Sequence, residues 1–436
     1  MQLKRFALGA LLTCAAVTGA QARESDNNTP DAVMTRLIAD FNAAVLRFAK
    51  AEDGLFTLKG LRTATMMHIA MHDALNSADQ RYERYTDSTQ ADIDDPYAAA
   101  TSAAYTIVLK QYPQQRDTWA QLRGRIRGAD TRNKNTEFGQ RLAESLFEGR
   151  DGDGWNSEAE YRFHPMGPGV YAEFAEHSGT PQGFVFGTGW ARARPFGLES
   201  ASQFRSPPPP AIDSREYARA FEEVKALGRH ASTARTADET HLAMWWKDFV
   251  ENSHNRLARK LVVEDQLDPW RAARMFALLN MAIYDGYLAS FENKFHYNHW
   301  RPYTAIRWAE HDGNALTQAD ESWDNLHHHT YAFPSYPSAH GTVCGAAMTV
   351  LADSFGAMRE FTMETREVDS SGPGSPPMAT QPPVRHFRSF DEAARECAMS
   401  RVYLGIHFRY DSEFGHDLGT QVADFLLRRK LIPLRH

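Results

Sequence analysis

Three short blocks of polar residues, in a fixed order along the second half of the chain, most constrain what it can fold into and bind. They run from Lys294 to Pro302, from Pro337 to Gly341 and from Ser400 to Asp411. Among their residues are the three cations Lys294, Arg301 and Arg401, the two histidines His340 and His407, the hydroxyl of Ser338 and two small residues whose backbone N–H groups can approach a ligand. A tetrahedral oxyanion needs this combination, because its charge must be neutralised while its oxygen atoms accept several hydrogen bonds. The blocks therefore predict an oxyanion site.

The internal spacing of the blocks resembles that of the superfamily of vanadium-dependent haloperoxidases and type 2 phosphatidic acid phosphatases. Its pattern is Lys-x6-Arg-Pro, Pro-Ser-Gly-His and Ser-Arg-x5-His-x3-Asp, and here it begins at Lys294, Pro337 and Ser400. The first and third blocks match in full, whereas Ala339 stands where the second block of the family usually has Gly. Ala keeps the N–H donor but disfavours positive φ. The sequence therefore does not decide which backbone conformation the loop adopts at this position.

The resemblance implies a role for each matching residue. His407 would be the axial ligand of vanadium, bonding it through a ring nitrogen, and His340 would act as acid and base on the opposite side. Hydrogen peroxide and halide would be the substrates, and Lys294 would help to polarise the oxidant. Three cations would neutralise the oxygens of bound vanadate, and two further residues would donate hydrogen bonds to it: Lys294, Arg301 and Arg401, with Ser338 and the N–H of Ala339.

The same residues also support an acid phosphatase. In that reaction His407 would attack phosphorus as a nucleophile, oriented by Asp411 one helical turn further on. His340 would protonate the leaving alcohol of a phosphate ester. Vanadate resembles the trigonal-bipyramidal transition state of this reaction, so one cradle serves both chemistries. A non-catalytic protein that binds phosphate or vanadate is a third interpretation.

Two features favour the peroxidase interpretation. The chain has 436 residues, whereas the small soluble acid phosphatases of the superfamily are much shorter. Phe291 lies three residues before Lys294, and Phe333 lies seven residues before His340. If these rings line the site, they make its wall apolar and favour halide over a large polar ester. Ordinary core packing of either Phe is the alternative.

Apolar residues recur at helical spacing along most of the chain, which predicts an all-α protein. The family is built from two four-helix bundles with the cofactor in the second, so the resemblance implies the same two halves here. Helices are predicted at 31–48, 63–78, 98–108, 135–147, 213–227, 236–250, 268–291, 341–355, 390–404 and 411–429, with 312–326 less clear and a Ser-, Gly- and Pro-rich loop at 370–383.

A Pro-rich run from Ser206 to Pro210 is expected to be extended and stiff, and we place the boundary between the halves there. A weak internal repeat, Arg62-x10-Asp73 against Arg274-x10-Asp285, supports two halves, although two amphipathic helices could share this pattern by chance. The predicted divisions are a signal peptide, an N-terminal helical half, a connector and a C-terminal bundle that holds the site, at 1–22, 23–205, 206–212 and 213–436.

The first 22 residues have the features of a secretory signal. Lys4 and Arg5 form a charged start, an apolar run follows from Phe6 to Val17, and the small residues at 20–22 fit a cleavage site. We therefore expect a secreted or periplasmic protein cleaved near Ala22. No other segment approaches the ~18 apolar residues that a bilayer crossing needs. The net charge of −7 argues against nucleic acid or an anionic membrane as partner, and the oligomeric state stays open.

Several histidines lie outside these roles. His68 and His72 share one helical face, and packing or hydrogen bonding is expected there rather than a metal pair. The run 327–329 is expected to be an exposed polar loop, because consecutive residues cannot converge on one ion from a regular element. His296 and His299 lie within the first block, and one of them could reach the anion or the halide.

Two further features carry weaker predictions. Cys344 and Cys397 remain after cleavage at Ala22, and they could pair in an oxidising compartment. The sequence alone does not place them within bonding distance. The segment Asp151-Gly-Asp-Gly is expected to be a turn, because the ligand register of a calcium loop fails after it.

Overall fold

The computed structural model describes residues 29–53, 58–87, 92–172, 184–328, 330–365 and 383–434. The predicted signal peptide and nearly all of the predicted loop at 370–383 lie outside the described residues. The described part is mostly helical, which confirms the all-α prediction, with one small antiparallel sheet of β1 (Phe361–Glu364) and β2 (Val384–Phe387). In the described ranges, none of the helices combines the length and the apolarity needed to cross a bilayer.

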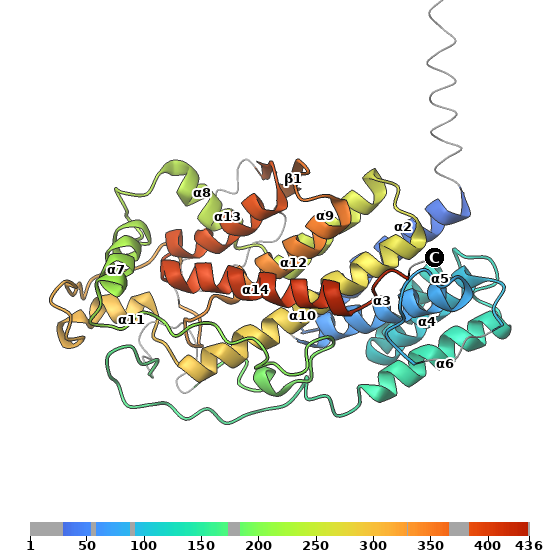
Figure 1. The fold of residues 1–436 in the computed structure, drawn as a ribbon, viewed down its shortest axis with the longest axis horizontal. Helices are drawn as coiled ribbons and strands as arrows, with labels where there is room; N and C mark the ends of the chain where they lie inside the picture. Colours follow the sequence, from blue (N-terminus) through green and yellow to red (C-terminus); the bar gives the residue numbers. More distant parts are fainter. Residues whose placement is uncertain are drawn as a thin grey trace, which may run out of the picture.

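A first group of helices lies at one end of the elongated molecule, coloured blue to teal in Figure 1. Helix α4 packs between α3 and α6, and side chains cap both α4 and α6. Asp95 accepts two backbone N–H groups at the start of α4, and Asn133 forms a capping box at the start of α6. The group comprises α2 (Pro30–Asp53), α3 (Leu58–Ala78), α4 (Pro96–Gln111), η1 (Pro113–Gln115), α5 (Arg116–Arg123) and α6 (Lys134–Gly149).

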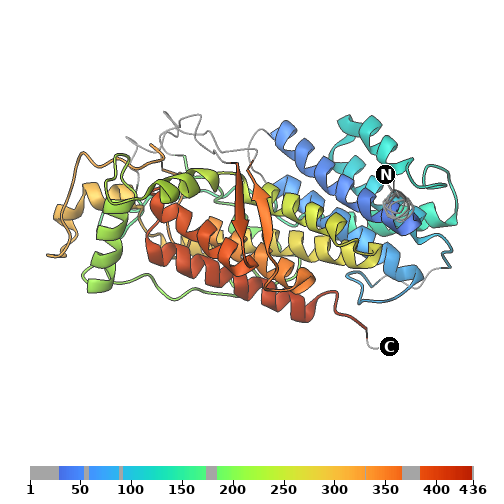
Figure 2. The same ribbon diagram turned by 90° about the horizontal axis from the view of Figure 1, so that it is seen from above.

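A second group occupies the centre and the other end of the molecule. Helix α12 lies at its heart and packs against α10, α13 and α14. The short hairpin of β1 and β2 lies over the middle of this group in Figure 2. Its helices are η2 (Trp190–Arg192), α7 (Arg215–Leu227), α8 (Ala237–Trp245), α9 (Val250–Glu264), α10 (Pro269–Tyr297), α11 (Pro302–Arg307), η3 (Ala309–His311), α12 (Ala339–Phe355), α13 (Phe390–Tyr403) and α14 (Arg409–Arg429).

Helix α10 joins the two groups, because it packs against α3 on one side and against α12 and α14 on the other. Asp268 caps its start, and Asn298 ends it in the left-handed conformation at φ 48°. The largest cluster of buried apolar side chains runs through both groups, from Met34 in α2 to Leu426 in α14 and Leu431 beyond it. The core is therefore continuous across the two halves.

The aspartates of the internal repeat have the same structural role in both halves. Asp73 on α3 accepts the backbone N–H groups of residues 85 and 86, and Asp285 on α10 accepts those of residues 196 to 198. Burial raises the pKa of both carboxyl groups to about 6. Each aspartate therefore ties a loop to a central helix, which is a physical reason for the shared residue.

Two predicted helices differ from the structure. The helix predicted at 236–250 ends at Trp245, and the sequence analysis missed α9, which begins five residues later. The unclear segment at 312–326 is not helical. The side chain of Asp312 accepts the N–H of Asn314, and the side chain of Asn314 accepts the N–H of residue 316. Such local bonds compete with the helical ladder and stabilise turns.

Candidate oxyanion site

The three sequence blocks meet near the N-terminus of α12. Lys294 comes from the last turns of α10, Arg301 precedes α11, Arg401 lies in the last turn of α13, and His407 lies between α13 and α14. All four side chains are buried. Arg301 Nη1 lies 3.3 Å from His407 Nε2. The fold thus joins segments that are about a hundred residues apart in the sequence.

Asp411 orients the ring of His407. The Nδ1 atom of His407 lies 3.0 Å from Asp411 Oδ2, which also accepts a bond of 2.5 Å from the hydroxyl of Ser335. Because a guanidinium only donates, the bond from Arg301 makes His407 Nε2 an acceptor and leaves the ring proton on Nδ1. Burial lowers the pKa of His407 well below its ordinary value, and the cations Arg301 and Lys294 lower it further. The ring is therefore neutral, with the Nε2 lone pair available.

The segment 333–335 holds two of the cations. Lys294 Nζ donates to the carbonyl oxygens of Pro334 and Ser335 at 3.0 and 2.7 Å, and Arg301 Nε donates to the carbonyl of Phe333 at 2.9 Å. Burial lowers the pKa of Lys294 well below its ordinary value, and Arg301 lowers it further, while Asp411 opposes the shift. Burial likewise lowers the pKa of Arg301 to about 10. The site therefore concentrates positive charge where hydration is poor.

Several buried polar atoms at this site have no hydrogen-bond partner in the described part of the chain. They are Arg301 Nη2, Arg401 Nε, Arg401 Nη1 and Asp411 Oδ1. The ring of Tyr331 lies beside both arginines, with its centroid 5.9 Å from each guanidinium carbon. Buried donors without partners are costly, and those on charged groups are the most costly. A bound oxyanion would satisfy these donors and compensate their charge, so the residues present fit vanadate or phosphate.

Ser338 and Ala339 form the start of α12. The hydroxyl oxygen of Ser338 accepts the N–H of Gly341 at 3.2 Å and so caps the helix. Ala339 has no positive φ, so its Cβ causes no backbone strain and the family's Gly is not required here. The first N–H groups of a helix lack intrahelical partners and favour anions. Gly415 on α14 allows the start of α12 to pack closely against α14, because a Cβ at position 415 would stand 2.5 Å from the carbonyl oxygen of Ser338.

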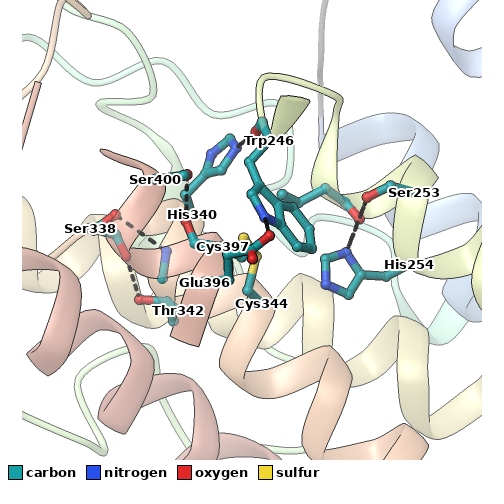
Figure 3. Close-up of a disulfide and its surroundings, with 12 residues drawn as sticks. Trp246, Ser253, His254, Ser338, His340, Thr342, Cys344, Glu396, Cys397 and Ser400 are labelled. Carbon is teal, nitrogen blue, oxygen red and sulfur yellow. Dashed lines mark hydrogen bonds between the residues drawn. A yellow bond between two sulfur atoms is a disulfide. The ribbon is translucent and has the colours of Figure 1, made fainter. Parts of the chain in front are cut away.

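His340 lies on the first turn of α12, half-buried, and bonds away from the anion-binding residues. Its Nε2 atom donates to the carbonyl oxygen of Trp246 at 2.9 Å (Figure 3). Because a carbonyl only accepts, Nε2 carries the proton when the ring is neutral, and Nδ1 is left as the base. Burial lowers the pKa of His340 well below its ordinary value, and Arg401 lowers it further. His340 can therefore exchange a proton through Nδ1.

Of the two predicted phenylalanines, Phe333 lies against the cations and Phe291 packs against Phe333. The ring centroids of Phe291 and Phe333 are 5.2 Å apart, and that of Phe333 lies 4.7 Å from the guanidinium carbon of Arg301 and 5.2 Å from Lys294 Nζ. Trp190 extends the group, with its ring 4.7 Å from Phe291. Phe291 also belongs to the main core cluster, so its predicted roles in the wall and in packing are compatible.

The remaining histidines have other partners. His68 bonds Asn42, and His72 bonds the carbonyl of Glu83, which confirms the expected hydrogen bonding on this helix. His299 bonds the hydroxyl of Tyr410 at 2.8 Å, and burial lowers its pKa to about 3. His296 is exposed. The prediction of an exposed loop is wrong for His327, which is fully buried and packs against Tyr331, while His329 lies outside the described residues.

The structure adds residues that the sequence analysis did not assign. Ser335 holds Asp411, Tyr331 contacts both arginines, and Trp246 binds His340. Ser335 could have been found, because it precedes Ser338 in the repeated Pro-Ser pattern of that loop. No sequence signal distinguishes Trp246 from other buried tryptophans. Cys344 and Cys397 form a disulfide that links α12 to α13.

Sequence comparisons find known proteins that are similar to this chain. The family described as the VCPO second helical-bundle domain matches residues 274–431, which carry all three blocks. The vanadium chloroperoxidase of Curvularia inaequalis is 24% identical over 261 residues, which cover 48% of this chain. The match spans only 42% of that relative's own length.

Solved structures have a similar fold. A bacterial vanadium-dependent iodoperoxidase superposes with a TM-score of 0.72 over 91% of this chain and 96% of that one, at 22% identity. A bacterial vanadium-dependent chloroperoxidase in its holo form superposes with a TM-score of 0.64 over 85% of this chain and 92% of that one, at 19% identity. At these identities the likeness establishes the fold, which extends over both helical groups.

Proposed function

Because the chain belongs to the superfamily of vanadium-dependent haloperoxidases and type 2 phosphatidic acid phosphatases, we propose that it binds vanadate and oxidises halide with hydrogen peroxide. One observation carries the proposal: among the described residues, buried guanidinium nitrogens of Arg301 and Arg401 have no hydrogen-bond partner, and both side chains lie beside the neutral ring of His407. That arrangement supplies charge and donors for an oxyanion, together with one nitrogen that can bind its central atom.

Each residue has a defined task in this reaction. Lys294, Arg301 and Arg401 neutralise the anion, and His407 offers Nε2 as the ligand while Asp411 holds its Nδ1 proton. Vanadate, when bound, would act as the Lewis acid that activates hydrogen peroxide. His340 takes up and returns a proton at Nδ1. The aromatic rings of Phe291 and Phe333 limit hydration around the cations, which strengthens their electrostatic effect.

A phosphatase is the second candidate, and the pairing of His407 with Asp411 favours it. A neutral ring with its Nδ1 proton held by a carboxylate is the arrangement that a histidine nucleophile requires. His340 would then protonate the leaving alcohol. The two reactions differ in the substrate, a peroxide and a halide in one case and a phosphate ester in the other, so they can be separated by assay.

The test uses protein stripped of phosphate, assayed with and without orthovanadate. Oxidation of iodide, bromide and chloride would be measured with hydrogen peroxide, and hydrolysis of an aryl phosphate without it. Vanadate-dependent halide oxidation would support the peroxidase, whereas ester hydrolysis that vanadate inhibits would support the phosphatase. His407→Ala should abolish either activity, while His296→Ala, an exposed histidine of the first block, should not. Inactivity in both assays with retained vanadate binding would support the interpretation as a non-catalytic oxyanion-binding protein.

We also propose that the protein is secreted or periplasmic. The disulfide between Cys344 and Cys397 supports this, because disulfides persist in oxidising compartments. Fractionation of expressing cells, with the mass of the mature chain, tests the location and the cleavage near Ala22. Recovery of uncleaved protein in the cytoplasm with free thiols would contradict it.

A further inference from the structure

His340 belongs to a closed ring of contacts that runs through Trp246, Glu396 and the disulfide (Figure 3). Its Nε2 donates to the carbonyl of Trp246, and the indole of the same Trp246 donates to Glu396 Oε1 at 2.9 Å. Glu396 directly precedes Cys397, whose disulfide leads to Cys344, one helical turn after His340 on α12. The ring therefore fixes the histidine through both its side-chain bond and its own helix.

Each member of the ring is held by further contacts. Trp246 is fully buried, and its ring lies 4.7 Å from that of Trp245 and 6.0 Å from that of Phe387. Arg385 on β2 donates to Glu396 through Nε and Nη2, both at 2.8 Å. The acceptor of the indole bond is thus fixed in place. A residue held at its ring can present its backbone carbonyl in one orientation.

The orientation of the His340 ring matters because a neutral imidazole has a single N–H. Arg401 on α13, His254 on α9 and His407 face His340 and disfavour a second proton on its ring. If Nε2–H were not held by Trp246, the ring could turn and present either nitrogen toward the anion. The nitrogen that exchanges the proton would then vary between molecules.

We infer that Trp246 and Glu396 are positioning residues, which hold Nε2–H of His340 so that Nδ1 faces the reaction. This inference rests on the proposed function for the role of His340 as acid and base. Among the described residues, no hydrogen bond or ion pair joins Trp246 or Glu396 to Lys294, Arg301 or Arg401. Their effect therefore falls on turnover and not on oxyanion binding.

The test compares four variants. Glu396→Ala and Trp246→Phe each remove the indole bond, and both should lower kcat about tenfold while the Kd for orthovanadate changes less than about twofold. Glu396→Gln keeps an acceptor oxygen and should recover most of the turnover. Trp245→Phe is the matched control, because its indole donates to the carbonyl of Pro383 at 2.8 Å and lies outside the ring.

A second measurement does not depend on turnover. In protein labelled with ¹⁵N-histidine and free of vanadate, the Nε2–H of His340 should exchange slowly with water, with His340→Gln identifying the signal. Trp246→Phe and Glu396→Ala should lose this protection, and Glu396→Gln and Trp245→Phe should keep it. Unchanged protection in Trp246→Phe, or equal losses of kcat and vanadate affinity, would overturn the inference. Protection in an inactive wild type would refute the proposed function but not the positioning.

Discussion

The two helical groups both bury arginine side chains, and they satisfy them in opposite ways. In the first, Arg62 and Arg150 each lie 2.8 Å from Asp153 Oδ2, and both also donate to backbone carbonyls. In the second, Arg301 and Arg401 are equally buried, yet they keep guanidinium nitrogens without partners in the described structure. The first cluster is complete within the protein, whereas in the second, among the described residues, the three cations outnumber the single carboxyl group of Asp411.

This difference shows which buried charge serves the fold and which serves a ligand. A carboxylate placed between two arginines compensates the cost of burying them. Lys294 and Arg301 interact with Asp411, whose pKa is raised to about 7 mainly by burial, so this carboxyl group offsets only part of the positive charge around His407. A buried arginine is therefore no sign of function by itself, whereas its unpaired donors are.

The largest effect is expected when the cluster of Arg62, Arg150 and Asp153 loses its carboxylate. Asp153→Asn leaves Arg62 and Arg150 buried without a counter-charge, and it should lower the free energy of unfolding by about 3–5 kcal/mol. Chemical denaturation measures the change. Asp151→Asn, two residues away on the surface, is the control and should have little effect. A loss below about 1 kcal/mol would show that the cluster is not a buried ion pair in solution.

At the cluster of Lys294, Arg301 and Arg401, a substitution is expected to lower anion binding or turnover without lowering stability. Arg401→Met should weaken orthovanadate binding or turnover about 10²–10³-fold, since it removes unsatisfied donors that only the anion uses. Without the anion, the variant should be as stable as the wild type or more so, because an uncompensated buried charge is lost. Calorimetric titration and denaturation measure the two quantities. Lower stability of the empty variant would mean that Arg401 supports the fold.

A smaller effect should distinguish the clusters by their response to anions. Orthovanadate or phosphate at about 100 times its Kd should raise the free energy of unfolding of the wild type by about 2.7 kcal/mol. Asp153→Asn should keep this increment although it is less stable, and Arg401→Met should lose it. Thermal unfolding with and without the anion measures it. A full increment in Arg401→Met would place the anion elsewhere.

A gradual, pH-dependent effect is expected at a buried carboxyl group outside both clusters. Glu251 accepts a bond from the Tyr287 hydroxyl at 3.2 Å, and burial raises its pKa to about 8. The folded state then keeps a proton that the unfolded state loses above about pH 4.5. Its contribution to stability is present below that pH and is lost as the pH rises to 8, by at most about 1.4 kcal/mol per pH unit.

Glu251→Gln removes this titration while its amide oxygen can still accept from Tyr287. The stability of the variant relative to the wild type should therefore rise between pH 5 and pH 8. Denaturation curves across that range give the difference. A difference that stays constant with pH would show that Glu251 titrates normally, as a hydrated carboxylate does.

The sequence by itself determined the helical class and most helix positions, and it predicted which residues would form an oxyanion site. Helical periodicity and capping residues act over a few neighbouring positions, and the spacing within each block sets which side chains share a face. The structure brings the eight residues named from the blocks together near the start of α12. Ala339 shows the limit of this reasoning, since only the backbone of α12 showed that no positive φ is needed there.

Only the tertiary structure decided which buried polar atoms have a hydrogen-bond or ion-pair partner. The pairing of Asp153 with Arg62, the disulfide between α12 and α13, and the bond from His340 to Trp246 each join segments distant in sequence. No local pattern fixes such distances, because they depend on how α10 and α12 pack with their neighbours. The same packing leaves Arg301 and Arg401 with donors that have no partner in the described parts of the chain, and this is the physical basis of the proposed function.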